Sequence, residues 1–404
     1  MVISSPFLVL CPLYHLPMNL VSSVPESPYI LRYLAYAIAT KAKQSVFDFQ
    51  YFPFRVLKRD SEEAELERNL IPSTGSLPVS QSSTNQTVDN LVRTSDTLSF
   101  LVLKDGKLVY EYYADGINGK TPMLCYSITK SLFSSYLSLL AANGVISFDD
   151  LLGQYHCQLP DFVANRTFQS LMNMESGIRY THGKGPFTDM VKFWLSTDIR
   201  RSLKEISPSV DGSGFFYYND IHLHLLNRMV DSRISDLFVD INHNFWQRLK
   251  PTSNALFCID SHQKKYLKMD GGMVVAPYDL AKFGLLYADN GLIYNSQVLS
   301  EDWCRSLKTS DGVRTDSDFW DLYRQMNHSW YPILKQGRTY YKNFWWGLKQ
   351  DNAPNDIYAM GILGQFVYVS TKNNVVIVRQ GNSWGVNGWW PYMLEEIASK
   401  IEDI

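Results

Sequence analysis

One tetrapeptide in this sequence, Ser127-Ile128-Thr129-Lys130, has the residue types and spacing needed for covalent catalysis by a serine. Residues i and i+3 share one face of a helix, so the Lys130 amine would lie one turn from the Ser127 hydroxyl. A serine in the first turn also lies among free backbone N–H groups at the positive end of the helix dipole. A nearby amine with a lowered pKa can help to remove the hydroxyl proton. The tetrapeptide alone would favour a helix-capping serine followed by a solvated lysine.

A second group of chemically useful side chains follows a glycine-rich turn. Residues 212–219 read GSGFFYYN and lead into an apolar helical run at 223–230. Within them, Tyr217-x-Asn219 supplies a phenol that can carry a proton and an amide that can position an amine or a substrate. Tyr217 could instead be a core aromatic, since the chain has 25 tyrosines. The nearby Asn219 favours the catalytic interpretation. It is also the only residue that selects Tyr217 over the adjacent Tyr218 as the catalytic phenol.

Taken in chain order, these motifs resemble the serine β-lactamase and penicillin-recognising family, in its class C, esterase and 6-aminohexanoate-dimer hydrolase branch. Three further segments carry the likeness, namely 171–178 (LMNMESGI), 270–284 (DGGMVVAPYDLAKFG) and 361–365 (GILGQ). The likeness extends over about residues 95–404 and is specific in combination.

The resemblance implies an α+β fold, with an antiparallel β-sheet flanked by helices beside a mostly helical lobe. It separates an N-terminal extension and linker of unassigned role, residues 1–94, from a hydrolase domain at 95–404. Within that domain, the α/β lobe is expected at 95–126 and 335–404, and the helical lobe at 127–334.

The resemblance also implies a mechanism. Ser127 would attack a carbonyl to form an acyl-enzyme, Lys130 would make its deprotonation easier, and Tyr217 would relay the proton. Asn219 would position Lys130 or the substrate. The backbone N–H groups of Ser127 and Gln365 would form the oxyanion hole, where one donor is typically worth about 10²–10³ in rate. No cofactor and no metal ion are expected.

One departure from the family pattern bears on the substrate. Where lactamases and peptidases commonly have Lys or His to bind a substrate carboxylate, this chain has Ile362, which cannot do so. We therefore expect an esterase or linear-amide hydrolase acting on a small molecule; the alternatives are a β-lactamase or D-alanyl peptidase, and a non-catalytic binding relative. The other pocket candidates, each equally able to be core residues, are Tyr180, Trp194, Trp345, Trp346 and Trp384.

Local patterns place these motifs on secondary structure. β-prone runs at 98–103 and 108–113, joined across Asp105-Gly106, predict a β-hairpin. Apolar spacing predicts a helix over 127–143, with Gly144 at its C-terminal cap. Residues 145–290 are expected to be mainly helical, and the Ser- and Pro-rich segment 72–87 to be a linker or long loop. Further strands are expected at 344–349, 357–360, 365–370 and 375–380, followed by an amphipathic segment at 392–401.

Composition limits the class of protein. The 404 residues are 45% apolar and carry a net charge of −2, which argues against a nucleic-acid partner. The five scattered cysteines and the histidine spacing suggest neither a disulfide framework nor a metal site. No apolar run is long enough to span a bilayer, and no cation precedes Arg32, so the cytoplasm is favoured over export. The 14% of aromatic residues, together with Ile362, favour neutral, partly apolar acyl substrates. The oligomeric state stays open.

Overall fold

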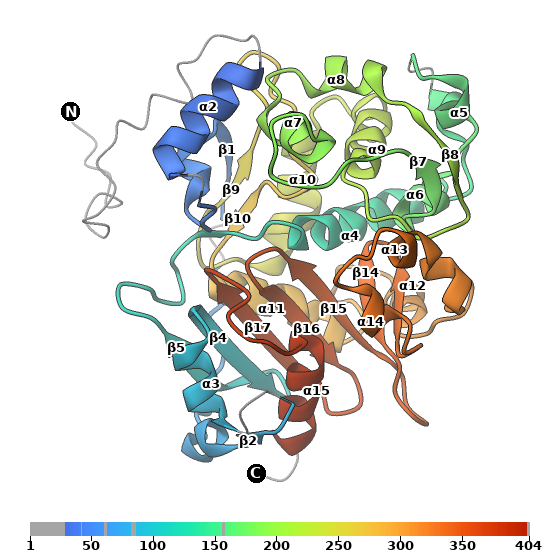
Figure 1. The fold of residues 1–404 in the computed structure, drawn as a ribbon. Helices are drawn as coiled ribbons and strands as arrows, with labels where there is room; N and C mark the ends of the chain where they lie inside the picture. The colour runs from blue at the N-terminus through green and yellow to red at the C-terminus, as the bar shows by residue number, and fades with distance from the viewer. Residues whose placement is uncertain (1–28, 42, 60–62, 82–85, 156–157, 402–404) are drawn as a thin grey trace, which may run out of the picture.

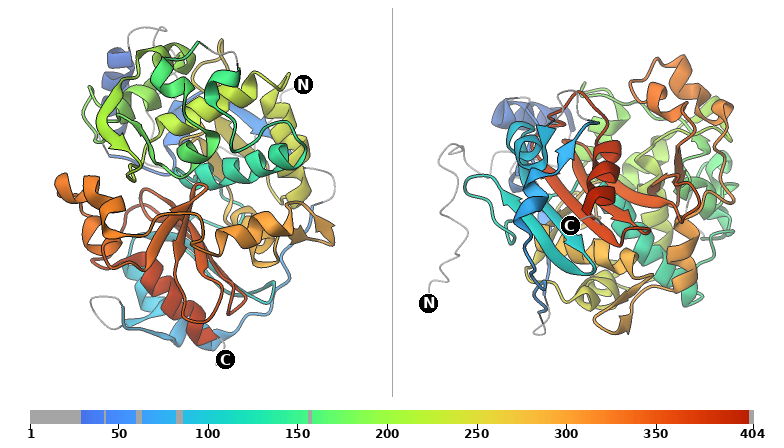
Figure 2. Two further views of the ribbon diagram at one scale, coloured as in Figure 1. Left: turned by 90° about the vertical axis from the view of Figure 1, so that its right-hand side faces the viewer. Right: turned by 90° about the horizontal axis from the view of Figure 1, so that it is seen from below.

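The chain folds into two lobes that meet along helix α4 (Ile128–Ala142) (Figure 1). The computed structural model describes residues 29–41, 43–59, 63–81, 86–155 and 158–401. One lobe holds a large sheet and the other holds most of the short helices, and they stand one above the other in the left view of Figure 2. This arrangement confirms the predicted α+β fold class.

The large sheet has seven strands, and every neighbouring pair is antiparallel. It joins an early hairpin to the C-terminal strands, because β4 pairs with β17 in a register that places Val102 opposite Ile377. Their order across the sheet is β13 (Thr339–Lys342), β14 (Trp345–Leu348), β15 (Asp356–Gly361), β16 (Gln365–Ser370), β17 (Val375–Gly381), β4 (Thr97–Lys104) and β5 (Lys107–Tyr113).

The β4–β5 hairpin confirms the prediction from the Asp-Gly dipeptide. Asp105 and Gly106 both have positive φ, at 49° and 80°, which is the conformation of a type I′ turn. Helix α11 (Pro277–Ala288) and helix α15 (Trp390–Lys400) pack on opposite faces of the sheet, and α3 (Val88–Thr94) packs on β4 (Figures 1 and 2). Although α11 lies inside the range expected for the helical lobe, it therefore belongs to the sheet lobe.

Helix α4 is the central element between the lobes. It ends as predicted, because Gly144 has a φ of 69° just after the last turn. The serines on its buried face are tied to the segment before β14: the Ser131 hydroxyl donates to the Phe344 carbonyl at 2.7 Å and the Ser134 hydroxyl to the Asn343 carbonyl at 2.5 Å. These bonds fix the helix that carries Ser127 and Lys130 against the sheet lobe.

The remaining elements are short. The segment 145–290 is less helical than expected, because it contains four strands besides its helices. The further α-helices are α2 (Tyr29–Thr40), α5 (Asp161–Ala164), α6 (Phe168–Met172), α7 (Asp189–Leu195), α8 (Ile199–Ser202), α9 (Ile221–Asp231), α10 (Leu237–Ile241), α12 (Glu301–Leu307), α13 (Asp321–Gln325) and α14 (Tyr331–Leu334). Single turns of 3-10 or π-helix are η1 (Asp48–Tyr51), η2 (Pro72–Ser76), η3 (Leu152–Tyr155), η4 (Leu203–Glu205), η5 (Asn242–Trp246), η6 (Gln247–Leu249) and η7 (Ser317–Trp320). The small two-stranded ribbons pair β2 (Pro78–Val79) with β3 (Gln86–Thr87), β7 (Ser176–Ile178) with β8 (Pro208–Ser213), and β11 (Leu292–Ile293) with β12 (Ser296–Gln297).

A second, four-stranded sheet contains strands from both sides of the predicted boundary at residue 94. Its order is β1 (Phe54–Leu57), β9 (Ala255–Cys258), β10 (Met273–Val275) and β6 (Met123–Leu124). The N-terminal segment thus supplies an edge strand, with Phe54 opposite Cys258, to the sheet whose other edge lies just before Ser127. The described part of the expected linker, residues 72–81 and 86–87, contains η2 and strands β2 and β3, and Val79 is fully buried. The described part of the predicted extension is therefore packed into the fold.

Among the described residues, no helix has both the length and the apolar character that crossing a bilayer requires.

Candidate active site

The start of helix α4 fixes Ser127. Tyr126, just before it, has a positive φ of 47°, so the chain turns sharply into the helix. The Cys125 N–H donates to the Met273 carbonyl at 2.9 Å, and the Thr129 hydroxyl accepts from the Met273 N–H at 3.1 Å. These bonds hold the first turn against β10. The positive end of the α4 dipole is therefore directed at the region around the Ser127 side chain.

Lys130 lies one turn further along α4, and its amine contacts three acceptors. Its Nζ is 2.9 Å from Ser127 Oγ, 2.5 Å from the carbonyl oxygen of Asp270 and 2.7 Å from Asp220 Oδ1. An ammonium group has three N–H donors and can serve several acceptors at once. The structure thus brings the predicted pair Ser127 and Lys130 together.

The charge state of Lys130 differs from the expected one. Burial alone would lower the pKa of this 1%-exposed amine, but the Asp220 carboxylate, Tyr218 and Asp270 together raise it above its ordinary value. Lys130 is consequently an ammonium ion. Burial alone would raise the pKa of Asp220, but Lys130 and a hydrogen bond from Tyr180 Oη at 2.5 Å lower it, so Asp220 is a carboxylate.

The tyrosine beside Ser127 is Tyr218, whereas the sequence predicted Tyr217. The Tyr218 hydroxyl is hydrogen bonded with Ser127 and Lys130, and the Lys130 Nζ lies 5.1 Å from the centre of its ring. Burial raises the pKa of Tyr218, and Lys130 only partly opposes this effect, so the phenol is neutral. The Tyr217 hydroxyl instead donates to the backbone carbonyl of Tyr180, and its ring lies edge-on to His182.

Asn219 is likewise one residue away from the side chain that contacts Lys130. Asn219 is fully buried; its Nδ2 donates to the Ile178 carbonyl at 2.9 Å and its Oδ1 accepts from the Ile221 N–H at 2.9 Å, so it joins the start of α9 to β7. The residue that holds Lys130 is Asp220, which the sequence prediction missed. If the motif is taken to begin at Tyr218, it becomes Tyr-x-Asp, and this alignment would have identified Asp220.

The end of strand β15 passes directly beside Ser127. A Cβ atom on Gly361 would lie 2.5 Å from the Cys125 carbonyl oxygen and 3.2 Å from the Ser127 nitrogen. Ile362, the next residue, lines the pocket that contains Ser127. Gln365, the predicted oxyanion residue, lies across the hairpin from Gly361, and its side-chain amide donates to the Gly381 carbonyl at 2.7 Å. Of these residues, Gly361 is the one whose backbone is shown to lie against the Ser127 nitrogen.

A cavity of about 350 Å³ opens onto Ser127, Tyr218 and Asp220. Of the predicted pocket residues, Trp194 and Ile362 line it. Helix α7 forms one wall, and the segment containing Tyr323, His328 and Trp330 forms another. The other lining residues include Tyr33, Tyr36, Ala37, Gln44, Tyr126, His182, Lys184, Met190, Val191, Leu195, Asp270 and Gly271.

The other predicted pocket residues have supporting positions. Tyr180 is 1% exposed and holds Asp220 through its hydroxyl. The Trp346 ring is stacked with that of Tyr218, with centroids 6.3 Å apart, and Trp345 is buried against Tyr287. Trp384 packs on Trp389 and Phe366, beside α15. These four predicted pocket residues are not among those that line the cavity.

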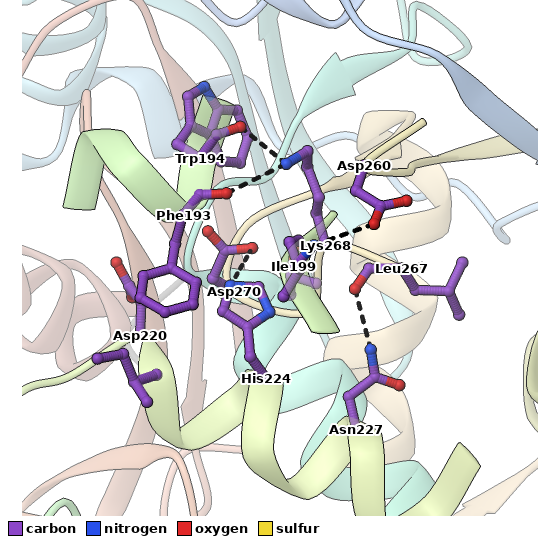
Figure 3. Close-up of polar contacts among 12 residues, drawn as sticks. Phe193, Trp194, Ile199, Asp220, His224, Asn227, Asp260, Leu267, Lys268 and Asp270 are labelled. Atoms are coloured by element: carbon purple, nitrogen blue, oxygen red, sulfur yellow. Dashed lines mark hydrogen bonds and ion pairs between the residues drawn. The ribbon is translucent and has the colours of Figure 1, made fainter. Parts of the chain in front are cut away.

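A buried polar cluster supports the site from behind (Figure 3). His224 is stacked on Phe193, and its Nε2 lies 3.6 Å from Oδ1 of Asp270, whose carbonyl accepts from Lys130. Burial lowers the pKa of His224 to about 4, so the imidazole is neutral. Nearby, Lys268 Nζ donates to the Trp194 carbonyl at 2.7 Å and thereby anchors the α7 wall. Among the described residues, no group of three or more His, Cys, Asp or Glu side chains could hold a metal ion.

Comparison with known proteins agrees with this architecture. The sequence model of the family described as Beta-lactamase matches residues 85–398. The 6-aminohexanoate-dimer hydrolase of Paenarthrobacter ureafaciens is 22% identical over 303 residues, which cover 71% of this chain and 73% of the relative. A Bacillus anthracis structure provisionally named a 6-aminohexanoate-dimer hydrolase superposes with a TM-score of 0.73 at 18% identity, covering 89% of this chain and 94% of the other. A penicillin-binding protein from Bacillus halodurans gives a TM-score of 0.56 at 16% identity, with coverages of 78% and 99%. The chain therefore belongs to the Beta-lactamase family of hydrolases.

Proposed function

We propose that this protein is a serine hydrolase that cleaves small esters or linear amides through an acyl-enzyme on Ser127. The observation that carries the proposal is the position of the Ser127 hydroxyl, 2.9 Å from the Lys130 ammonium and hydrogen bonded with the Tyr218 phenol, at the floor of a cavity. A nucleophile, a proton carrier and a fixed positive charge are what acyl transfer requires.

In the proposed acylation step, Ser127 Oγ attacks the substrate carbonyl carbon and its proton passes to the Tyr218 oxygen. Because Tyr218 is a neutral phenol, it gives its own proton to the leaving alkoxide or amine as it takes the new one. The Lys130 ammonium, held by Asp220, stabilises the negative charge that develops on Ser127 Oγ. Water then attacks the acyl carbon, and the same relay returns a proton to Ser127.

The developing oxyanion would be bound by backbone donors. The N–H of Ser127 is at the free end of α4, and the chain at Gly361-Ile362 lies against it. Preorganised amides of this kind are worth about 10²–10³ in rate each. We assign the second donor to the N–H of Ile362.

The substrate class follows from the residues around Ser127. The Ile362 side chain offers no charge for a substrate carboxylate, which supports a neutral ester or amide over a β-lactam or a D-alanyl peptide. The name of the Paenarthrobacter relative supports the linear-amide option.

A panel of p-nitrophenyl esters and linear p-nitroanilides tests the proposal, together with labelling by a fluorophosphonate. We expect turnover and one adduct, located on Ser127 by mass spectrometry. The Ser127→Ala variant should show neither while its circular dichroism is unchanged, and its rate should fall by about 10⁴-fold or more. A folded wild-type protein that forms no adduct and turns over no substrate would identify a non-catalytic binding relative.

A further inference from the structure

Helix α2 lies in the N-terminal segment and reaches the catalytic cavity. Tyr33, Tyr36 and Ala37 line the same cavity as Ser127, from a helix that precedes the family-matched residues 85–398. The opposite face of α2 is turned to solvent, where Ile38 is 67% exposed. The helix therefore adds a wall to the pocket with one of its faces.

Specific contacts hold this wall in place. The Tyr36 hydroxyl donates to Asp48 Oδ2, and the Tyr36 ring packs against Tyr51 and Phe52, with centroids 6.3 and 5.8 Å away. The Tyr33 hydroxyl donates to the Lys184 carbonyl at 3.3 Å, on the loop that leads into α7. Helix α2 is thus fixed both by its own segment and by the loop that leads into α7.

An aromatic series continues from α2 to the residue before the nucleophile. Phe52 lies edge-on to Trp194, with centroids 5.1 Å apart, and Trp194 packs on Tyr126 at 6.2 Å. The Tyr126 hydroxyl donates to the Ser45 carbonyl at 2.7 Å. The N-terminal segment therefore contacts both the α7 wall and the sharp turn that presents Ser127.

In the proposed mechanism, the two walls of the cavity would contact different parts of the substrate, the leaving group and the acyl group. The Tyr218 phenol protonates the leaving group in the proposed mechanism, and its ring contacts Trp330 at 5.9 Å, so the leaving group is expected on the Trp330 side. The α2 and α7 wall instead adjoins Tyr126 through Trp194. Its side chains are uncharged and mostly apolar, namely Tyr33, Tyr36, Ala37, Met190, Val191, Trp194 and Leu195.

We propose that α2 and α7 together form an acyl-binding subsite, and that α2 gives the enzyme a preference for apolar acyl groups of medium length. This inference rests on the proposed serine hydrolase function and names its substrate class. Apolar acyl carbons gain free energy by leaving water, about 0.8 kcal/mol per buried methylene group, so a longer chain that fits this wall raises kcat/KM.

Ala37 and Ile38 give a matched pair of variants for the test. Ala37→Trp places an indole in the subsite, whereas Ile38→Trp places it on the solvent side of the same helix. We expect Ala37→Trp to lower the ratio of kcat/KM for p-nitrophenyl octanoate to that for the acetate by about tenfold or more. Ile38→Trp should leave this ratio unchanged. An equal ratio in wild type and Ala37→Trp, or the same loss in both variants, would overturn the proposal.

A binding measurement separates this inference from the proposed function. Octanamide is titrated calorimetrically into the Ser127→Ala protein, with and without Ala37→Trp, and thermal unfolding checks that each variant folds. We expect Ala37→Trp to weaken octanamide binding by about tenfold. Octanamide binding that is unaffected by Ala37→Trp overturns the subsite even when esters are hydrolysed. If Ala37→Trp weakens octanamide binding but the wild-type protein hydrolyses no ester or amide, the subsite is supported and the hydrolase function is rejected.

Discussion

Lys130 and Asp220 form an ion pair at the floor of the cavity, with 2.7 Å between Nζ and Oδ1 and only 1% of the lysine side chain exposed. The pair explains why the lysine next to Ser127, the proposed nucleophile, is charged rather than neutral: the Asp220 carboxylate, with smaller contributions from Tyr218 and Asp270, outweighs the effect of burial on the Lys130 pKa. In the proposed mechanism, Lys130 therefore acts as a fixed positive charge, and Tyr218 alone moves the proton.

Asp220→Asn tests this assignment. Removal of the carboxylate leaves burial as the main influence on Lys130, so its pKa falls and the ammonium is lost at a lower pH than in the wild type. We expect kcat/KM to decrease overall, and its decline at alkaline pH to begin earlier. The free energy of unfolding should fall by about 3 kcal/mol, because one partner of a buried ion pair is removed. Asp236→Asn, which breaks the more exposed pair with Arg55, is the control and should change stability by less than about 1 kcal/mol. An unchanged pH profile in Asp220→Asn would contradict the role of Lys130.

The adjacent tyrosines provide a second test. Tyr218→Phe removes the hydroxyl beside Ser127 and should lower kcat for ester hydrolysis by about 10²–10⁴-fold, with little change in KM. Tyr217→Phe removes only a hydrogen bond to the Tyr180 backbone and should have a mild effect. Steady-state kinetics of both variants decide the question. A larger loss of kcat in Tyr217→Phe than in Tyr218→Phe would instead support Tyr217, the tyrosine predicted from the sequence.

A substitution at Gly361 tests the proposed oxyanion site, which is formed by backbone N–H groups. A methyl group at this position would contact the Cys125 carbonyl and the Ser127 nitrogen, so Gly361→Ala must move β15 or the start of α4. We expect kcat to fall strongly, with a loss of stability of about 1–3 kcal/mol from overpacking. Gly185→Ala is the control, because its added Cβ would lie 3.9 Å from the Thr188 methyl group. Retention of wild-type kcat in Gly361→Ala would argue against the assigned oxyanion site.

The sequence predicted those parts of the fold that are encoded locally. The β4–β5 hairpin follows from Asp105-Gly106, where both residues adopt positive φ, and α4 follows from its apolar spacing and Gly144. Each of these signals acts within a few residues, so no knowledge of distant partners is needed.

The site was predicted only where a helix fixes the spacing. Ser127 and Lys130 come together because i and i+3 share a face of α4, whereas Tyr217 and Tyr218 lie in a loop whose register no periodicity determines. Matching the loop through Asn219 placed the motif one residue too early and concealed Asp220. The position of Gly361 against Ser127 and the contribution of α2 depend on packing between distant segments, which the local pattern does not contain.

The buried imidazole of His224 predicts how stability depends on pH. Burial lowers its pKa to about 4 in the folded protein, whereas a histidine in the unfolded chain titrates near pH 6.5. Between these values the unfolded state binds the additional proton, so this residue reduces the free energy of unfolding as the pH falls from 6.5 towards 4, by up to about 1.4 kcal/mol per pH unit. Asp48 and Asp356 act in the opposite direction, because burial raises their pKa values to about 6 and the folded state then binds protons first.

Comparison of variants isolates the histidine. His224→Phe keeps a ring on Phe193 and removes the titrating group, and neither ring nitrogen of His224 has a hydrogen-bond partner to lose. Urea unfolding of both proteins at pH 7.5 gives the pH-independent effect of the substitution. As the pH is lowered to 4.5, the free energy of unfolding of His224→Phe should increase relative to the wild type, with the difference growing below pH 6.5. A difference that stays constant over this range would mean that His224 binds its proton equally well in the folded and unfolded states, and the buried cluster behind Lys130 would then be accessible to water.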